Sequence, residues 1–132
     1  RQLSFGYLDM AWHGLSAPVD DKLDIKAFEE AAWSKALILP PSPPNAVMST
    51  AFGHIFSGGY AAGYYGYKWA EVLDADAFAA FKEVGIFDRE VAGRFRREIL
   101  ERGDTADAME LYVAFRGHEP DIAPLLKRTG LV

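Results

Sequence analysis

Apolar residues recur at three- and four-residue spacings along most of the chain, and no segment alternates apolar and polar residues over more than a few positions. The first spacing is typical of amphipathic helices, whereas strands require the second. We therefore predict an all-α fold. A chain of 132 residues, half of them hydrophobic, is long enough to form one helical core.

The first predicted helix begins directly after Arg1, with Leu3, Tyr7, Met10 and Ala11 on its buried face. No capping residue precedes this helix. Because natural domains usually open with a cap or a loose tail, we interpret the chain as a piece of a longer protein. A trimmed natural domain is the alternative.

A second helix is predicted after Asp24, with Ile25, Phe28 and Ala32 on one side. It ends before the segment 40–45, which contains four prolines. Prolines remove backbone donors and push the preceding residues toward extended conformations, so we predict a rigid connector here. A ligand for a polyproline-binding module is the less favoured alternative.

The later helices are predicted from their capping residues. Asp88 is expected to begin a helix that Gly103 stops, and Asp107 with Glu110 has the spacing of a capping box. Gly117 is expected to end that second helix, and a short last helix should follow Pro120. The expected inward residues are Val91, Phe95, Ile99, Ala108, Leu111, Tyr112, Phe115, Ile122, Leu125 and Leu126.

The segment 53–69 combines glycines, tyrosines and one histidine. It covers the end of a short predicted helix at 48–56, a bend at Gly58 and Gly59, and the start of a long predicted helix at 60–84. On a helix, Tyr60, Tyr64 and Tyr67 fall at i, i+4 and i+7 and share one face. We predict that the opposite face packs in the core, because it carries a tryptophan and aliphatic residues. Its members are Tyr65, Trp69, Val72 and Leu73.

Two interpretations of the tyrosine face are open at this point. Tyrosines often bury the ring and leave the hydroxyl in water, so the face could be ordinary packing. However, each glycine inside a helix costs about 1 kcal/mol relative to alanine, a cost accepted more readily where a backbone or ligand must approach closely. Aligned phenols beside a glycine loop can donate hydrogen bonds to a peptide carbonyl and to the oxyanion formed when it is attacked.

The run from Phe52 to Phe81 resembles the glycine- and tyrosine-rich segment of the thimet oligopeptidase, oligopeptidase A and peptidyl-dipeptidase family. The likeness extends upstream to the Leu-Asp-Met-Ala-Trp-His run at 8–13. It continues downstream through Gly-Ile-Phe at 85–87 and Phe-Arg-Gly at 115–117 to Leu-Leu at 125–126, close to where the chains of that family end. The resemblance therefore covers nearly the whole chain and implies the C-terminal helical part, 1–132, of a larger helical metallopeptidase.

Members of that family hold one zinc ion through a helical H-E-x-x-H motif and a downstream glutamate. This chain has no such motif, and its three histidines are isolated from one another. The resemblance thus places the zinc outside the chain, which contributes no metal ligand. It implies oxyanion-stabilising, catalytic roles for Tyr60 and Tyr67, and substrate binding by His54, Tyr64, Gly58 and Gly59.

The implied activity is hydrolysis of peptide bonds in short peptides by the full-length zinc oligopeptidase, with the isolated chain inactive. The segment before His54 lacks the Arg-Tyr pair associated with many peptidyl-dipeptidases, so endo- and dipeptidyl-cleavage both stay open. The alternative function is a non-catalytic helical module that binds peptides or other proteins. His13 and His118, which have no partner at ligand spacing, are interpreted as structural or solvent-facing.

Charge and composition limit the partners. The net charge is -5, with 14 basic and 19 acidic residues interleaved, which argues against nucleic-acid binding. No apolar stretch approaches the roughly 20 residues of a membrane-spanning helix. The absence of cysteine fits a reducing compartment, so we expect a cytoplasmic protein. We also expect the isolated chain to self-associate through apolar surface.

Overall fold

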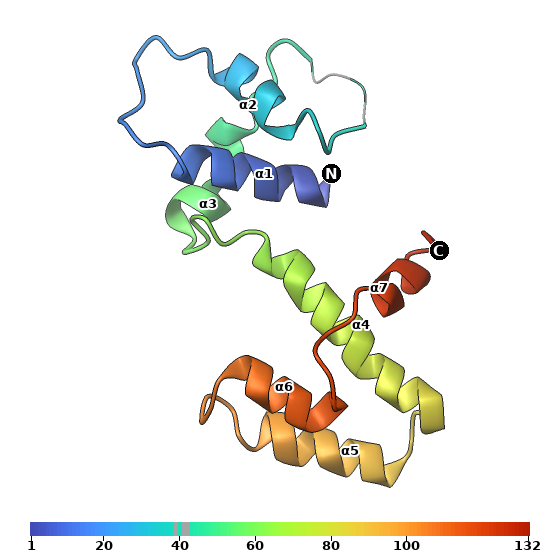
Figure 1. Cartoon of the computed structure of the whole chain (residues 1–132). Coiled ribbons are helices and arrows are strands. Elements are labelled where there is room, and N and C mark those ends of the chain that lie inside the picture. The colour runs from blue at the N-terminus through green and yellow to red at the C-terminus, as the bar shows by residue number, and fades with distance from the viewer. Residues whose placement is uncertain (39, 41–42) are drawn as a thin grey trace. The chain divides into compact units, whose positions relative to one another are not determined.

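A computed structural model describes residues 1–38, 40 and 43–132, and these residues form helices and turns without any strand (Figure 1). The all-α prediction is confirmed. The chain divides into two compact units, Arg1–Lys68 and Trp69–Val132, and each unit has an apolar core of its own. The α-helices are α1 (Gln2–His13), α2 (Ile25–Trp33), α3 (Gly53–Ser57), α4 (Gly66–Val84), α5 (Arg89–Phe95), α6 (Ala108–Arg116) and α7 (Ala123–Arg128).

The first unit is organised around α1, which lies between α2 and α3 (Figure 1). Its buried core joins Leu8 of α1, Trp33 of α2 and the pair Phe52 and Ile55 at α3. A short 3-10 helix, Ser49–Ala51, precedes α3, and Phe52 separates the two. The single short helix predicted at 48–56 is therefore split into two turns of different geometry.

The buried face predicted for α1 is wrong. Leu3 is 61% exposed, and Tyr7 and Met10 are also exposed. The buried residues are Ser4, Leu8 and Asp9, on the side that meets α2 and α3. Helical spacing identifies apolar faces of a helix, but it does not show which face packs against the neighbouring helices.

Helix α2 begins where its cap predicted, because the Asp24 carboxylate accepts a hydrogen bond of 3.0 Å from the Ala27 amide. Ile25 is exposed, so the apolar face was assigned only in part correctly. Of the predicted connector, position 40 and residues 43–45 are not helical, whereas positions 41 and 42 lie outside the described residues.

The second unit contains most of α4 together with α5, α6 and α7, and α5 and α6 lie side by side in it (Figure 1). The predicted cap residues Asp88 and Asp107 and the predicted end at Gly117 are confirmed. Asp88 accepts hydrogen bonds from the amides at the start of α5, Asp107 does the same for α6, and Gly117 ends α6 with a φ of 84°. One π-helical turn, Arg96–Leu100, continues α5. The buried core residues are Ala80, Val91 and Phe115.

One expectation for α4 and one for the last helix are wrong. Tyr65 and Trp69 are exposed, and the buried residues of α4 are Ala75, Asp76 and Ala80. Asp76 is buried against α6. Ile122 is exposed, whereas Leu125 is buried as predicted.

Candidate functional site: a tyrosine cluster

The segment 60–65 is not helical, contrary to the prediction of one helix from 60 to 84. It forms a series of tight turns, in which the Gly63 amide donates to the Tyr60 carbonyl at 2.9 Å and the Gly66 amide donates to the Gly63 carbonyl at 3.0 Å. Helix α4 begins only at Gly66. Helical spacing therefore cannot explain where the three tyrosines lie.

A buried carboxylate holds this segment. The two oxygens of Asp9 in α1 accept hydrogen bonds of 2.9 Å each, one from the Ala62 amide and one from the Tyr64 amide. Asp9 is fully buried. Ala62 has a φ of 54°, in the left-handed region that non-glycine residues rarely occupy. The hydrogen bonds to this carboxylate thus compensate for the unfavourable backbone conformation of Ala62, which interrupts the predicted helix.

The imidazole of His13 completes the surroundings of this carboxylate. Its Nδ1 lies 2.8 Å from Asp9 Oδ1 and 2.9 Å from the Asp9 carbonyl oxygen. Both of these oxygens are acceptors in this arrangement, so Nδ1 carries the hydrogen and donates it. His13, interpreted from the sequence as structural or solvent-facing, is therefore a structural partner of a buried acid.

The turns bring the predicted tyrosines together. The rings of Tyr60 and Tyr67 stack with centroids 5.2 Å apart, and the ring of Tyr64 meets that of Tyr67 edge-on at 5.1 Å. The imidazole of His54 lies 6.0 Å from the ring of Tyr60 and 6.3 Å from that of Tyr64. We refer to His54, Tyr60, Tyr64 and Tyr67 as the tyrosine cluster. Four of the six predicted site residues thus share one place.

Tyr64 connects the tyrosine cluster to the core of the first unit. Its ring packs edge-on against Phe52 at 5.0 Å and against Phe5 at 6.0 Å. Such edge-to-face pairs add about 0.5–1.5 kcal/mol each to the stability gained from burial. The ring of Tyr64 is therefore fixed, whereas Tyr60 and Tyr67 are 39% and 42% exposed and accessible from solvent.

The hydroxyl of Tyr67 is held in its protonated form. A side-chain hydrogen bond with Tyr60 contributes most to raising the pKa of Tyr67 above 10.0, and desolvation and the neighbouring phenols add to it. A hydrogen bond raises the pKa of a phenol when it favours the neutral form, so at neutral pH the hydroxyl of Tyr67 keeps its hydrogen.

The two predicted glycines form the bend that precedes the tyrosine cluster. A Cβ added at Gly58 would lie 2.8 Å from the His54 carbonyl oxygen and 3.0 Å from the His54 Cα, so no side chain fits there. Gly59 has a φ of 78°, which disfavours any residue with a Cβ. The chain can turn back toward His54 only because both positions are glycine.

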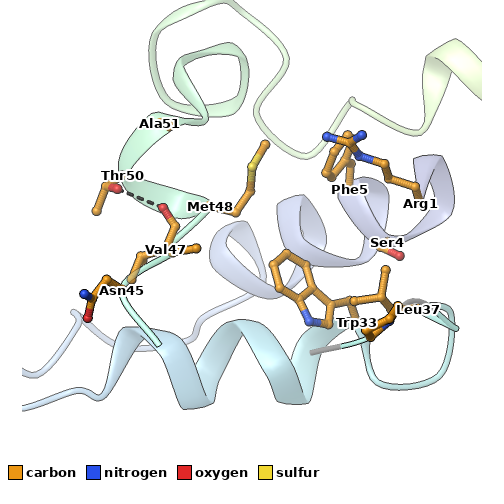
Figure 2. Close-up of a pocket in the computed structure, with 12 residues that line it drawn as sticks. Arg1, Ser4, Phe5, Trp33, Leu37, Asn45, Val47, Met48, Thr50 and Ala51 are labelled. Atoms are coloured by element: carbon orange, nitrogen blue, oxygen red, sulfur yellow. Dashed lines mark hydrogen bonds between the residues drawn. The ribbon is translucent and has the colours of Figure 1, made fainter. Parts of the chain in front are cut away.

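A separate hollow of about 530 Å³ lies in the first unit between α1, α2 and the segment 45–51 (Figure 2). Figure 2 shows Phe5, Trp33 and Met48 around it, with Arg1 at one side. The wall is mostly apolar. None of the predicted site residues lines this hollow, so it is distinct from the tyrosine cluster.

The described part of the chain does not fit a zinc site. Residues 1–38, 40 and 43–132 contain no group of three or more His, Cys, Asp or Glu side chains placed to hold a metal ion. His54 and the phenols alone do not make a ligand set that zinc prefers. In the same described residues, no helix is long and apolar enough to cross a membrane.

Comparison with known proteins identifies the family. The model of "Peptidase family M3" matches residues 1–131. The chain belongs to peptidase family M3. The resemblance seen in the sequence is thereby confirmed.

The chain is similar to several peptidases of that family. It is 45% identical to oligopeptidase A of Escherichia coli over 99% of its own length, and 44% identical to dipeptidyl carboxypeptidase of Salmonella typhimurium over 98%. It is 42% identical over its whole length to the Arabidopsis thaliana protein named "Organellar oligopeptidase A, chloroplastic/mitochondrial". The chain spans only 17% to 19% of the length of these relatives.

Proposed function

We propose that the chain is part of a zinc metallo-oligopeptidase that hydrolyses peptide bonds in short peptides. In this proposal the zinc is bound by residues outside the chain. Tyr60 and Tyr67 donate hydrogen bonds to the oxyanion of the attacked carbonyl, while His54, Tyr64, Gly58 and Gly59 contact the substrate. The isolated chain, which has no zinc ligand set among its described residues, is inactive.

One observation carries this proposal. Two accessible phenols, Tyr60 and Tyr67, stack 5.2 Å apart beside His54 in a member of a peptidase family. Phenol hydroxyls that stay protonated at neutral pH can donate to a developing oxyanion, and the raised pKa of Tyr67 supports this capacity. Ordinary packing does not need two accessible phenols stacked beside a histidine.

The test uses the full-length protein that contains this chain and a quenched short peptide. We expect hydrolysis that a metal chelator abolishes and added zinc restores. Tyr67→Phe should lower kcat by about 10²- to 10³-fold, because one oxyanion donor is lost. Tyr65→Phe is the matched control, since Tyr65 lies in the same segment, is 60% exposed and makes no ring contact with the tyrosine cluster.

The alternative, a non-catalytic peptide-binding module, predicts a different result. Hydrolysis would be absent from the full-length protein, while the isolated chain would bind peptide in a way that Tyr67→Phe weakens. Unchanged kcat in Tyr67→Phe, with hydrolysis intact, would refute the catalytic role of the hydroxyl and leave the cluster as packing.

We further propose that the protein acts in the cytoplasm. The absence of cysteine supports this proposal. The family does not decide the compartment, because the Arabidopsis relative is named chloroplastic/mitochondrial. Fractionation of cells that produce the full-length protein, followed by detection with an antibody against this chain, would decide it.

A further inference from the structure

The segment that carries the tyrosines has no regular secondary structure to hold it. Residues 60–65 consist of turns, and their conformation includes the unfavourable φ of 54° at Ala62. A non-glycine residue in this region is unfavourable unless its surroundings compensate. Some other part of the molecule must therefore fix the backbone between Tyr60 and Tyr64.

Asp9 is placed to do this. Its side chain reaches the turns from α1 and accepts one amide hydrogen with each carboxylate oxygen, at 2.9 Å from Ala62 and 2.9 Å from Tyr64. Hydrogen bonds to a charged acceptor are stronger than those to a neutral one. His13 donates to Oδ1 from one helical turn further along α1, which fixes the orientation of the carboxylate.

We infer that Asp9 is a positioning residue, whose buried carboxylate holds the backbone at Ala62 and Tyr64 so that the rings of the tyrosine cluster face one space. This inference rests on the proposed function of the cluster. Asp9 itself is fully buried and contacts no substrate, so it acts only through the residues that it holds. A displacement of about 1 Å at a site of this kind can lower a rate about 100-fold.

The matched control is Glu29, a second buried carboxylate in the same unit. It accepts hydrogen bonds from the amides of Met48, at 3.0 Å, and Ser49. Asp9→Asn and Glu29→Gln each replace one acceptor oxygen by an amide group that cannot accept. The two variants therefore make the same chemical change at two different backbone segments.

The first measurement is hydrogen exchange by mass spectrometry in the full-length protein, which needs no activity. We expect faster exchange over 58–66 in Asp9→Asn and over 47–50 in Glu29→Gln. Unchanged exchange over 58–66 in Asp9→Asn would overturn the inference, because the carboxylate would then not hold the turns.

The second measurement is hydrolysis of a quenched peptide by the same proteins. We expect kcat to fall about 100-fold in Asp9→Asn with KM changed less than threefold, and to stay within about threefold in Glu29→Gln. A wild-type kcat in Asp9→Asn with faster exchange over 58–66 would overturn the positioning role while the proposed function stands. Absence of hydrolysis in the wild-type protein would refute the proposed function and the positioning role with it, whereas the exchange result would still show whether Asp9 holds the turns.

If Asp9→Asn does not fold, His13→Ala decides the question. It removes one hydrogen-bond donor to Asp9 at a partly exposed position. We expect faster exchange over 58–66 and a kcat lowered about fivefold, the effect of one ordinary hydrogen bond. Wild-type values in both measurements would overturn the inference.

Discussion

The guanidinium of Arg116 contacts both carboxylate oxygens of Asp76, with Nη2 3.2 Å from Oδ1 and Nε 3.4 Å from Oδ2. The hydroxyl of Tyr112 donates to the same carboxylate at 2.5 Å. These three residues join α4 to α6 inside the second unit. Asp76 and Arg116 are both largely buried. Each compensates the charge of the other, and either charge alone would be unfavourable at a buried position.

Removing one partner of this pair should destabilise the protein strongly. Asp76→Ala is expected to lower the free energy of unfolding by about 3–5 kcal/mol, because the buried charge of Arg116 then keeps only its 3.4 Å contact with the exposed Glu83. Asp74→Ala is the control, since the Asp74–Arg128 pair is exposed and should contribute less than about 1 kcal/mol. Urea unfolding monitored by circular dichroism measures both. Equal losses in the two variants would contradict the role assigned to the buried pair.

The carboxylate of Asp76 should make the folding stability depend on pH in the acidic range. Burial acts to raise the pKa of Asp76, but the hydrogen bonds from Arg116 and Tyr112 outweigh it and hold the pKa below 3.8. A lowered pKa gives stability that is present above 3.8 and is lost as the pH falls through the folded-state pKa. We expect the difference in melting temperature between wild type and Asp76→Asn to shrink as the pH falls below 3.8. A difference independent of pH would contradict this.

The phenol of Tyr67 should lose its proton later than an ordinary tyrosine. Its pKa is raised, so the neutral form is favoured in the folded state, and the associated stability is present below 10.0 and lost as the pH rises through the folded-state pKa. Tyr60→Phe removes the hydrogen bond that contributes most, so the titration of Tyr67 should move down toward 10.0. Titration of the tyrosinate absorbance measures this. Tyr65→Phe is the control, because it removes a phenol without changing the titration of Tyr67.

The bend at Gly58 should tolerate no side chain. In Gly58→Ala the new Cβ would meet the His54 backbone at 2.8 Å and 3.0 Å, so the segment after α3 must shift. We expect a loss of about 1–3 kcal/mol in stability and a lower kcat in the full-length protein. Gly53→Ala is the matched control, because its Cβ would lie at an ordinary 3.6 Å from the Ser57 hydroxyl. Equal effects of the two changes would show that the tight contact is unimportant.

The isolated chain should self-associate through the exposed side of the first unit. Leu3, Tyr7 and Met10 of α1 and Tyr65 line an apolar groove that no described residue of the unit covers. Exposed apolar patches of this kind promote association. Sedimentation of the isolated chain should show species larger than the monomer, and Leu3→Glu with Met10→Lys should restore the monomer. A clean monomer in the unaltered chain would contradict the prediction.

Sequence alone predicted the features whose causes are local. Asp24, Asp88 and Asp107 cap helices through amides within three residues, and Gly117 ends α6 by its own backbone conformation. Such signals need no knowledge of the rest of the fold. The same is true of the all-α class, which follows from spacing along the chain.

What the sequence could not predict depends on distant partners. The burial of α1 was assigned to the wrong side, because two stripes were available and only packing against α2 and α3 selects one. The turns at 60–65 replaced a predicted helix because Asp9 accepts their amides from far along the chain. The tyrosines still cluster, but for a different reason from the one that the spacing suggested. An acidic residue inside a mostly apolar helix was the one available signal for Asp9.

The bond from the Ala62 amide to Asp9 joins residues 53 positions apart in the sequence. Closing a loop of this length is entropically unfavourable until α1, α2 and α3 have packed, and contacts between distant residues form slowly. The tyrosine cluster should therefore be among the last parts of the unit to assemble, after α1 has packed against α2 and α3.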